Sequence, residues 1–242
     1  MSRPVYVFTD LDDTLFQTRG KCGDGTVHEA AYGKEGQALS FHTEEQIALL
    51  ALFGTATLIP VTGRNLDALS RVRSIHFPWV KITSHGAVVL GADKRLLPSW
   101  EQVLEAELPA WSARFEETLA HARDRIKSER LSLRAKIVYD QDIPVYVSIK
   151  GATDAIANMA EAFRPLWRQG VIHCNGHNMA LLPPFASKAR AVGHVMDLIR
   201  EEAVAPPLFV GLGDSLTDLA FLKLCHFALT PRDSQIHQEA WA

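Results

Sequence analysis

A chain of 242 residues can hold one or two domains with a sizeable core, and its 47% hydrophobic and 22% charged residues are typical of a globular protein. The formal net charge of −3 excludes a strongly basic nucleic-acid-binding class. The most apolar stretch, "IALLALFGTATLIPV", is interrupted by Gly, Thr and Pro before it reaches a membrane-spanning length. Cys22, Cys174 and Cys225 are widely spaced and form no CxxC pair, so we expect reduced thiols and a cytoplasmic location.

The first part of the chain alternates strand-like and helix-like segments. "PVYVFT" is rich in β-branched and aromatic residues, and "TEEQIALLALF" has helical spacing behind Thr43, a suitable N-cap. "ATLIPVT" predicts a second buried strand, and "RNLDALSRV" predicts a helix. Residues 16–42 are irregular and too long for an ordinary connection, so they predict a hairpin or flap.

The middle of the chain has a different pattern. Residues 99–127 are helical and charged, with Pro109 dividing or starting a helix. The strand candidates "RAKIVYD" and "VYVSIKG" follow, then the helix candidate "TDAIANMAEAFRPLWRQG" and short strands at "VIHC" and "NMALLP". Strands on both sides of a helix predict a small α+β unit.

The alternating pattern returns near the C-terminus. "SKARAVGHVMDLIREE" predicts a helix, "PPLFVGLGD" a strand, "SLTDLAFLKLC" a helix and "HFALT" a last strand. We therefore predict an α/β fold: a doubly wound parallel-sheet (Rossmann-like) core of residues 1–87 and 185–242, with an α+β cap domain inserted at residues 88–184.

The first strand ends in an acidic cluster, "FTDLDDT", which contains Asp10, Asp12 and Asp13. Ligands of open parallel sheets bind beyond the carboxyl ends of the strands. Two like charges about 4 Å apart repel by about 4 kcal/mol at an effective dielectric of about 20. The cluster must therefore protonate one carboxylate or bind a cation.

A second acidic cluster, "VGLGDSLTD", favours the cation. Asp214 directly follows an apolar strand, and Asp218 lies four residues later. Carboxylates without neighbouring Cys or His suit a hard ion, and magnesium is the usual ion where phosphate also binds. The alternative is that Asp214 and Ser215 only cap a helix.

Two further segments predict anion binding. "IPVTGRN" ends a strand with the hydroxyl of Thr62 and with Gly63, where backbone amides could hold an anion. Lys188, in "FASKARAV", lies near the start of a helix and could neutralise a phosphoryl group. Each signal is weak alone, because Thr-Gly turns are common and most lysines are solvated.

Together these segments resemble the four motifs of the haloacid dehalogenase superfamily of phosphatases, over the whole chain. "DLDDT" resembles the first motif, "VTGR" the second, Lys188 the third and "GDSLTD" the fourth. The insertion between the second and third motifs resembles the large cap of the sugar-phosphate phosphatase branch, which includes sucrose-phosphate and mannosyl-3-phosphoglycerate phosphatases.

The resemblance implies a chemistry for these residues. Asp10 would be the nucleophile and Asp12 the general acid and base. Thr62, Gly63 and Lys188 would hold the phosphoryl oxygens. The implied magnesium ligands are the Asp10 and Asp214 side chains and the Asp12 carbonyl, with Asp218 a further ligand or a supporting group.

Two positions depart from the family pattern. Thr217 stands where Asn is usual in the fourth motif, and His85 stands where Asn is common before the cap. His85 is a candidate substrate contact, or otherwise a residue of the linking strand. Asp13 occupies a variable position and receives no catalytic role.

The expected function is that of a magnesium-dependent phosphomonoesterase. Its substrate would be a small phosphorylated metabolite, a sugar phosphate above all, and it would act through an aspartyl-phosphate. A sugar phosphomutase and a phospho-accepting signalling domain are the alternatives, and Asp12 and the insertion argue against the second. We expect neither nucleic acid nor membrane as a partner, and the sequence indicates no oligomeric state.

Overall fold

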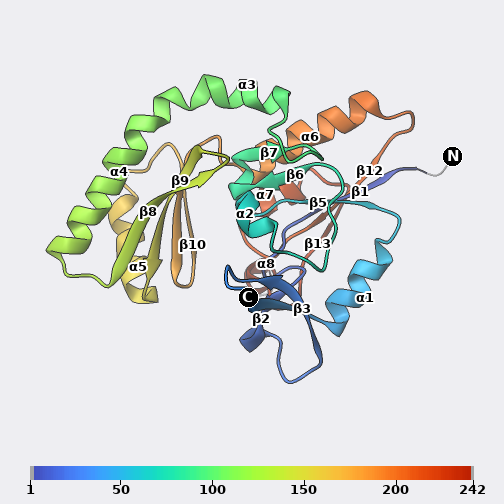
Figure 1. Cartoon of the computed structure of the whole chain (residues 1–242), viewed down its shortest axis with the longest axis horizontal. Coiled ribbons are helices and arrows are strands. Elements are labelled where there is room, and N and C mark those ends of the chain that lie inside the picture. Colours follow the sequence, from blue (N-terminus) through green and yellow to red (C-terminus); the bar gives the residue numbers. More distant parts are fainter. Residues whose placement is uncertain (1–2, 241–242) are drawn as a thin grey trace. The chain divides into compact units, whose positions relative to one another are not determined.

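The computed structural model describes residues 3–240 and divides into two compact units (Figure 1). We call residues 1–96 with 188–242 the core unit, and residues 97–187 the inserted unit. The insertion begins later than the expected residue 88, because β7 (Val88–Leu90) pairs with β6 (Lys81–Thr83) as an antiparallel hairpin of the core unit. Among the described residues, no helix is long and apolar enough to cross a membrane.

A four-stranded parallel sheet forms the centre of the core unit. Its strand order is β13-β12-β1-β5, and a parallel bridge between Val61 and Ile82 continues it towards β6. The strands span Phe227–Leu229 (β13), Leu208–Leu212 (β12), Val5–Thr9 (β1) and Thr57–Pro60 (β5). From β1 the chain first adds β5 on one side, and later adds β12 and β13 on the other side. The direction in which strands are added therefore reverses between β1 and β12.

Helices pack on both faces of this sheet. On one face, Leu49 and Leu50 of α1 (Glu44–Leu52) pack against the hydrophobic cluster that contains Val7 of β1. On the other, Phe8 and Phe209 have ring centroids 5.9 Å apart, and α6 (Lys188–Glu202) crosses above them, with the Arg200 guanidinium 5.2 Å from the Phe209 ring. The predicted doubly wound core is therefore confirmed.

The N-cap of α1 agrees with the sequence, whereas two other helices are shorter than predicted. Thr43 forms a capping box with Gln46 at the start of α1, as expected. The helix predicted at residues 64–72 is reduced to α2 (Leu66–Leu69), and the one predicted at 215–225 is reduced to α7 (Leu219–Leu222). The second prediction fails because the Asp218 carboxylate binds backbone amides of the preceding loop and holds it as a turn.

Residues 17–43 fold as a small antiparallel sheet that bears out the expected hairpin or flap. Its order is β2-β4-β3, with strands Gln17–Thr18, Ala38–Thr43 and Val27–Tyr32 and a short 3-10 helix at Arg19–Lys21. Ala30 and Ala31 of β3 join the core cluster beside Phe16. This segment is thus anchored next to the acidic end of β1.

His42, on β4, ties this small sheet to its neighbours and predicts a pH dependence of stability. Its Nδ1 lies 2.7 Å from the Leu15 carbonyl and its Nε2 lies 2.7 Å from the Ser74 hydroxyl. Burial lowers the pKa of His42 below its usual value. His42 therefore binds a proton more readily in the unfolded chain than in the folded one. The free energy of unfolding should decrease as the pH falls below about 6.5, the pKa of an unperturbed histidine.

We expect the melting temperature of the wild type to fall more between pH 7.5 and pH 5.5 than that of His42→Gln, which has no titrating ring. Thermal melts of both proteins across this range test the expectation. Parallel pH profiles for the two proteins would contradict it.

The inserted unit is an antiparallel sheet covered by helices on one face (Figure 1). The sheet order is β10-β11-β9-β8, and the buried aromatic side chains Trp111, Phe115 and Phe163 lie on the helices. The strands are β8 (Leu133–Asp140), β9 (Ile143–Gly151), β10 (Val171–Asn175) and β11 (Asn178–Leu182), and the helices are α3 (Pro98–Glu107), α4 (Pro109–Ser128) and α5 (Thr153–Phe163). The predicted α+β character of the insertion is confirmed.

Candidate active site

Asp10 lies directly beyond the carboxyl end of β1 and meets Lys188 from the other end of the chain. The Lys188 Nζ donates to Asp10 Oδ1 at 2.6 Å and to Asp218 Oδ1 at 2.7 Å. All three side chains are buried. Lys188 begins α6, so its ammonium comes from the second half of the core unit and bridges the two acidic clusters.

The loop after β12 wraps closely around Asp218. The amides of Asp214 and Ser215 and the Ser215 hydroxyl donate to Asp218 Oδ2, at 3.2, 3.0 and 2.8 Å. Gly213 lies so close that a Cβ there would be 2.6 Å from the Asp218 Cβ. Both oxygens of Asp218 therefore have protein donors, and its carboxylate fixes the loop and the Lys188 ammonium.

Asp214 is less completely bonded. Its Oδ1 accepts a hydrogen bond from the Thr14 hydroxyl at 3.1 Å, and among the described residues its carboxylate has no other hydrogen-bond donor. Burial, with the nearby Asp218 charge, raises the pKa of Asp214 to about 6. The sequence analysis missed Thr14, although its hydroxyl follows the acidic run "DLDD" directly.

The charges of this cluster do not balance. One oxygen from each of Asp10, Asp214 and Asp218 falls within 4.8 Å of the others. Within residues 3–240, Lys188 is the one cation that bonds to this cluster, through Asp10 and Asp218. Burial and the other two carboxylates raise the pKa of Asp10. Burial by itself would lower the pKa of Lys188, but the charges of Asp10 and Asp218 outweigh burial and raise it. A bound cation would relieve this excess negative charge, and an all-oxygen donor set suits a hard divalent ion.

Thr62, Gly63 and His85 come together at the end of β5. The His85 amide donates to the Thr62 carbonyl at 2.9 Å, and the Thr62 hydroxyl accepts from the Arg64 amide at 3.1 Å. A Cβ at Gly63 would lie 2.6 Å from the His85 ring, so the imidazole needs a glycine beneath it. Ser84 and His85 both have positive φ, 51° and 60°, which marks a tight and strained turn at this site.

The Asp12 carboxylate pairs with Arg64, a residue to which the sequence analysis assigned no role. The Arg64 Nε and Nη2 donate to the two oxygens of Asp12, both at 2.7 Å. The Arg64 guanidinium also lies 5.1 Å from the Phe16 ring, and the Arg64 side chain is 18% exposed. The only sequence signal was the position of Arg64 directly after the "VTG" turn.

Two remaining positions have structural explanations. Asp13 adopts a left-handed φ of 62°, and its carboxylate accepts from the Lys21 Nζ at 2.6 Å, so it helps to shape the turn. Thr217, at the position where Asn was expected, has its hydroxyl 2.8 Å from the Ser215 hydroxyl. Thr217 therefore supports the same loop through a shorter side chain.

No protein-family model matches the chain, and no curated protein sequence matches it. Solved structures do match its fold. A sucrose-phosphatase from Synechocystis, solved with sucrose and phosphate, is 16% identical with a TM-score of 0.56, over 99% of this chain and 87% of that one. A haloacid dehalogenase-like hydrolase from Bacteroides thetaiotaomicron is 12% identical with a TM-score of 0.54, over 98% of both chains.

A trehalose-6-phosphate phosphatase from Aspergillus fumigatus has a TM-score of 0.50 and 16% identity, over 96% of this chain and 85% of that one. These likenesses cover both units rather than the parallel sheet alone. They confirm the predicted resemblance at the level of the fold. The chain therefore has the fold of the haloacid dehalogenase-like phosphatases, with an α+β unit inserted into a doubly wound core.

Proposed function

We propose that the chain is a magnesium-dependent phosphomonoesterase that hydrolyses a small phosphorylated metabolite, a sugar phosphate, through an aspartyl-phosphate. The observation that carries the proposal is the convergence of Asp10, Lys188 and Asp214 at one edge of the sheet. Neighbours of the same fold are a sucrose-phosphatase and a trehalose-6-phosphate phosphatase, which supports a phosphorylated sugar as the substrate.

Asp10 would carry out the first step. Its carboxylate oxygen attacks phosphorus, a bond forms between that oxygen and phosphorus, and the bond from phosphorus to the sugar oxygen breaks. Lys188, bonded to Asp10, supplies positive charge beside the phosphoryl group. The Thr62 hydroxyl and the Gly63 amide would bind the phosphoryl oxygens.

Asp12 would move the protons in both steps. It donates a proton to the departing sugar oxygen, and the resulting carboxylate then takes a proton from a water molecule. The water oxygen bonds to phosphorus, the bond to Asp10 breaks, and inorganic phosphate leaves. Arg64 holds both oxygens of Asp12 and would orient this carboxylate.

Asp10, Asp214 and the Asp12 carbonyl would hold the magnesium ion, with Asp218 as a further ligand or as a support through its contact with Lys188. The ion would offset the negative charge of the carboxylates and of the phosphate. Both oxygens of Asp218 already accept hydrogen bonds from the protein. This favours Asp218 as a support for Lys188 and the loop over Asp218 as a direct magnesium ligand.

Removing magnesium is expected to abolish hydrolysis of p-nitrophenyl phosphate, and adding it back should restore the rate. At a hundredfold excess over Kd, binding stabilises the folded state by about 2.7 kcal/mol, which raises Tm by about 5–10 °C for a chain of this size. Rates and melts with chelator and with magnesium measure both effects. Asp214→Asn should reduce the shift in Tm, and full activity in chelator would contradict the metal requirement.

Replacing Arg64 with Ala is expected to lower kcat for the same substrate by about 10- to 100-fold, part of the 10²–10⁴-fold that general acid–base catalysis supplies. Arg64→Lys should recover part of kcat, because it keeps the charge but loses the two-pronged contact. Arg71→Ala is the matched control, since Arg71 pairs with Asp67 outside the site. An unchanged kcat in Arg64→Ala would contradict a positioning role.

A further inference from the structure

A cavity of about 400 Å³ lies at the edge of the core unit where the parallel strands begin. Its lining comes from Arg3 before β1, from the end of α6 and residues 203–207 before β12, and from His226 before β13. The Arg3 Nε donates to the Pro206 carbonyl at 2.8 Å and so joins two of these segments. Asp10, by contrast, follows β1, and its position seven residues after Arg3 puts it about 23 Å away along an extended chain. The cavity is therefore separate from the candidate active site.

Cations line this cavity, and no carboxylate offsets them there. Its described lining includes Arg3, Arg200 and His226 as the polar residues, and no aspartate or glutamate. The Arg200 Nη1 donates at 2.7 Å to Asp197, an exposed residue of α6 outside the lining. Within residues 3–240, the other nitrogens of Arg200 and both terminal nitrogens of Arg3 have no hydrogen-bond or ion-pair partner. Two guanidiniums that share a cavity repel each other, and a bound anion would relieve this repulsion.

Phe209 fixes the positions of two of these donors. Its amide donates to the His226 Nδ1 at 3.0 Å, and the His226 amide donates to the Phe209 carbonyl at 2.9 Å. The two rings stack with their centroids 5.5 Å apart, and the Arg200 guanidinium lies 5.2 Å from the Phe209 ring. Because Nδ1 accepts a hydrogen bond, the proton of the neutral imidazole is on Nε2. His226 therefore adds a third donor to the two guanidiniums.

Donor chemistry narrows the class of ligand. Guanidinium groups and an imidazole N–H donate hydrogen bonds, so together they suit a head group that only accepts, such as a carboxylate or a phosphate. The wall formed by residues 203–207, "AVAPP", is apolar and suits an aliphatic body. No hydroxyl, thiol or carboxylate side chain belongs to the described lining. We therefore expect the cavity to hold its ligand without reacting with it.

We propose that this cavity is a second anion-binding site, for a small organic anion with a carboxylate or phosphate head group and an aliphatic body. The Arg3 and Arg200 guanidiniums would bind the head group, and His226 would donate a further hydrogen bond. The ligand would contact the end of α6 and the start of β12. The inference goes beyond the proposed function and does not depend on it.

A ligand series with one body and three head groups tests the proposal. The ¹⁵N-labelled full chain is titrated with hexanoate, hexylphosphonate and the neutral hexanamide, and NMR follows the Nε–H signals of Arg3 and Arg200 and the Phe209 amide. We expect saturable shifts with at least one anion, and at least tenfold weaker binding of hexanamide. The anion with the lower Kd identifies the preferred head group. The Gly63 amide reports separately on any binding of hexylphosphonate at the candidate active site.

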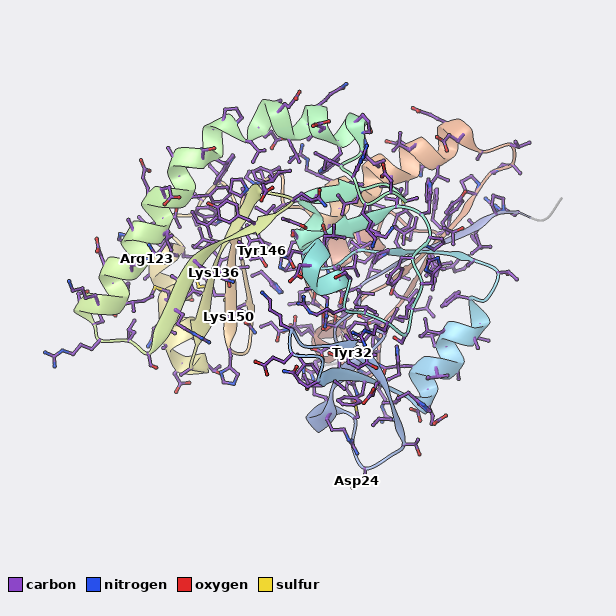
Figure 2. The ribbon with its side chains drawn as sticks, viewed as in Figure 1. Asp24, Tyr32, Arg123, Lys136, Tyr146 and Lys150 are labelled. Atoms are coloured by element: carbon purple, nitrogen blue, oxygen red, sulfur yellow. The ribbon has the colours of Figure 1, made fainter. Side chains whose placement is uncertain are left out.

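The double variant Arg3→Gln, Arg200→Gln should weaken anion binding by about tenfold or more, as followed at the Phe209 amide. Arg73→Gln is the matched control, because the Arg73 guanidinium lies 4.4 Å from the ring of Tyr32, on β3 of the small sheet (Figure 2). The control thus removes an arginine–aromatic contact of the same unit outside the cavity, and it should keep the wild-type Kd within about twofold.

Melting curves establish that each variant is folded, and Arg3→Gln alone replaces the double variant if that protein does not fold. No saturable shift with either anion would overturn the proposal. Equal affinity for hexanamide, or an unchanged Kd in the arginine variant, would overturn it as well. Absence of p-nitrophenyl phosphate hydrolysis would contradict the proposed function alone, because the titration requires no catalysis.

Discussion

Asp10→Asn is expected to lower kcat for p-nitrophenyl phosphate by about 10⁴-fold or more, the scale on which loss of a nucleophile acts. The amide has nearly the same shape as the carboxylate, but it cannot form an acyl phosphate. The substitution should not unfold the protein. Burial and the nearby carboxylates raise the pKa of Asp10, so its ionised form is held at a cost that a neutral amide avoids.

Two measurements together distinguish lost chemistry from lost structure in this variant. Initial rates should collapse, while the melting temperature in the absence of magnesium should stay equal or rise. Asp13→Asn is the matched control, since Asp13 pairs with Lys21 and should leave the rate within about twofold. Wild-type rates in Asp10→Asn would refute the covalent mechanism.

Lys188→Met is expected to affect both activity and stability. Removing the ammonium leaves Asp10 and Asp218 buried without the cation that both contact, and breaking a buried ion pair costs about 3–5 kcal/mol. The variant also loses a positive charge beside the phosphoryl group, which we expect to lower kcat by about 10²–10³-fold. Denaturant titration measures the first effect, and initial rates on p-nitrophenyl phosphate measure the second.

Lys81→Met provides the control for this experiment. Lys81 is also a buried lysine of the core unit, but its Nζ donates to the Trp79 carbonyl and burial lowers its pKa. Burying the Lys81 ammonium is unfavourable, so replacing it with Met should change the free energy of unfolding little. Activity should persist, because Lys81 makes no contact with the acidic cluster. Equal losses in both variants would indicate a packing role for Lys188 rather than an electrostatic one.

The core sheet could be predicted because its strands carry local signals. Segments such as "VYVFT" and "LFVGL" combine β-branched and aromatic residues with turn residues at their ends. The positions of Asp10, Thr62 and Asp214 at strand ends followed from those signals, since the carboxyl ends of parallel strands share one edge. The predicted role of each residue depended further on the family resemblance.

Contacts between distant residues were not accessible in the same way. The Asp12–Arg64 pair spans 52 positions, and no local pattern indicates which distant side chain the Arg64 guanidinium contacts. The length of α7 was overestimated for a related reason. Apolar spacing predicts a helix, but the Asp218 carboxylate withdraws two backbone amides from it.

Pairs of residues on neighbouring strands illustrate a third kind of limit on local patterns. Arg134 and Lys150 stand in separate strands, and only the antiparallel register brings them opposite each other. Alternation along each strand predicts which residues share a face within that strand. It does not say which residues of the neighbouring strand lie beside them.

The most direct test of the central claim is to trap the covalent intermediate. The enzyme is mixed with p-nitrophenyl phosphate and magnesium, quenched in acid during turnover, and reduced with borohydride, which converts an aspartyl-phosphate to homoserine. Mass spectrometry of the digested protein should find homoserine at position 10, and none in Asp10→Asn. Continued phosphate release with an unmodified Asp10, or homoserine at another aspartate, would contradict the account.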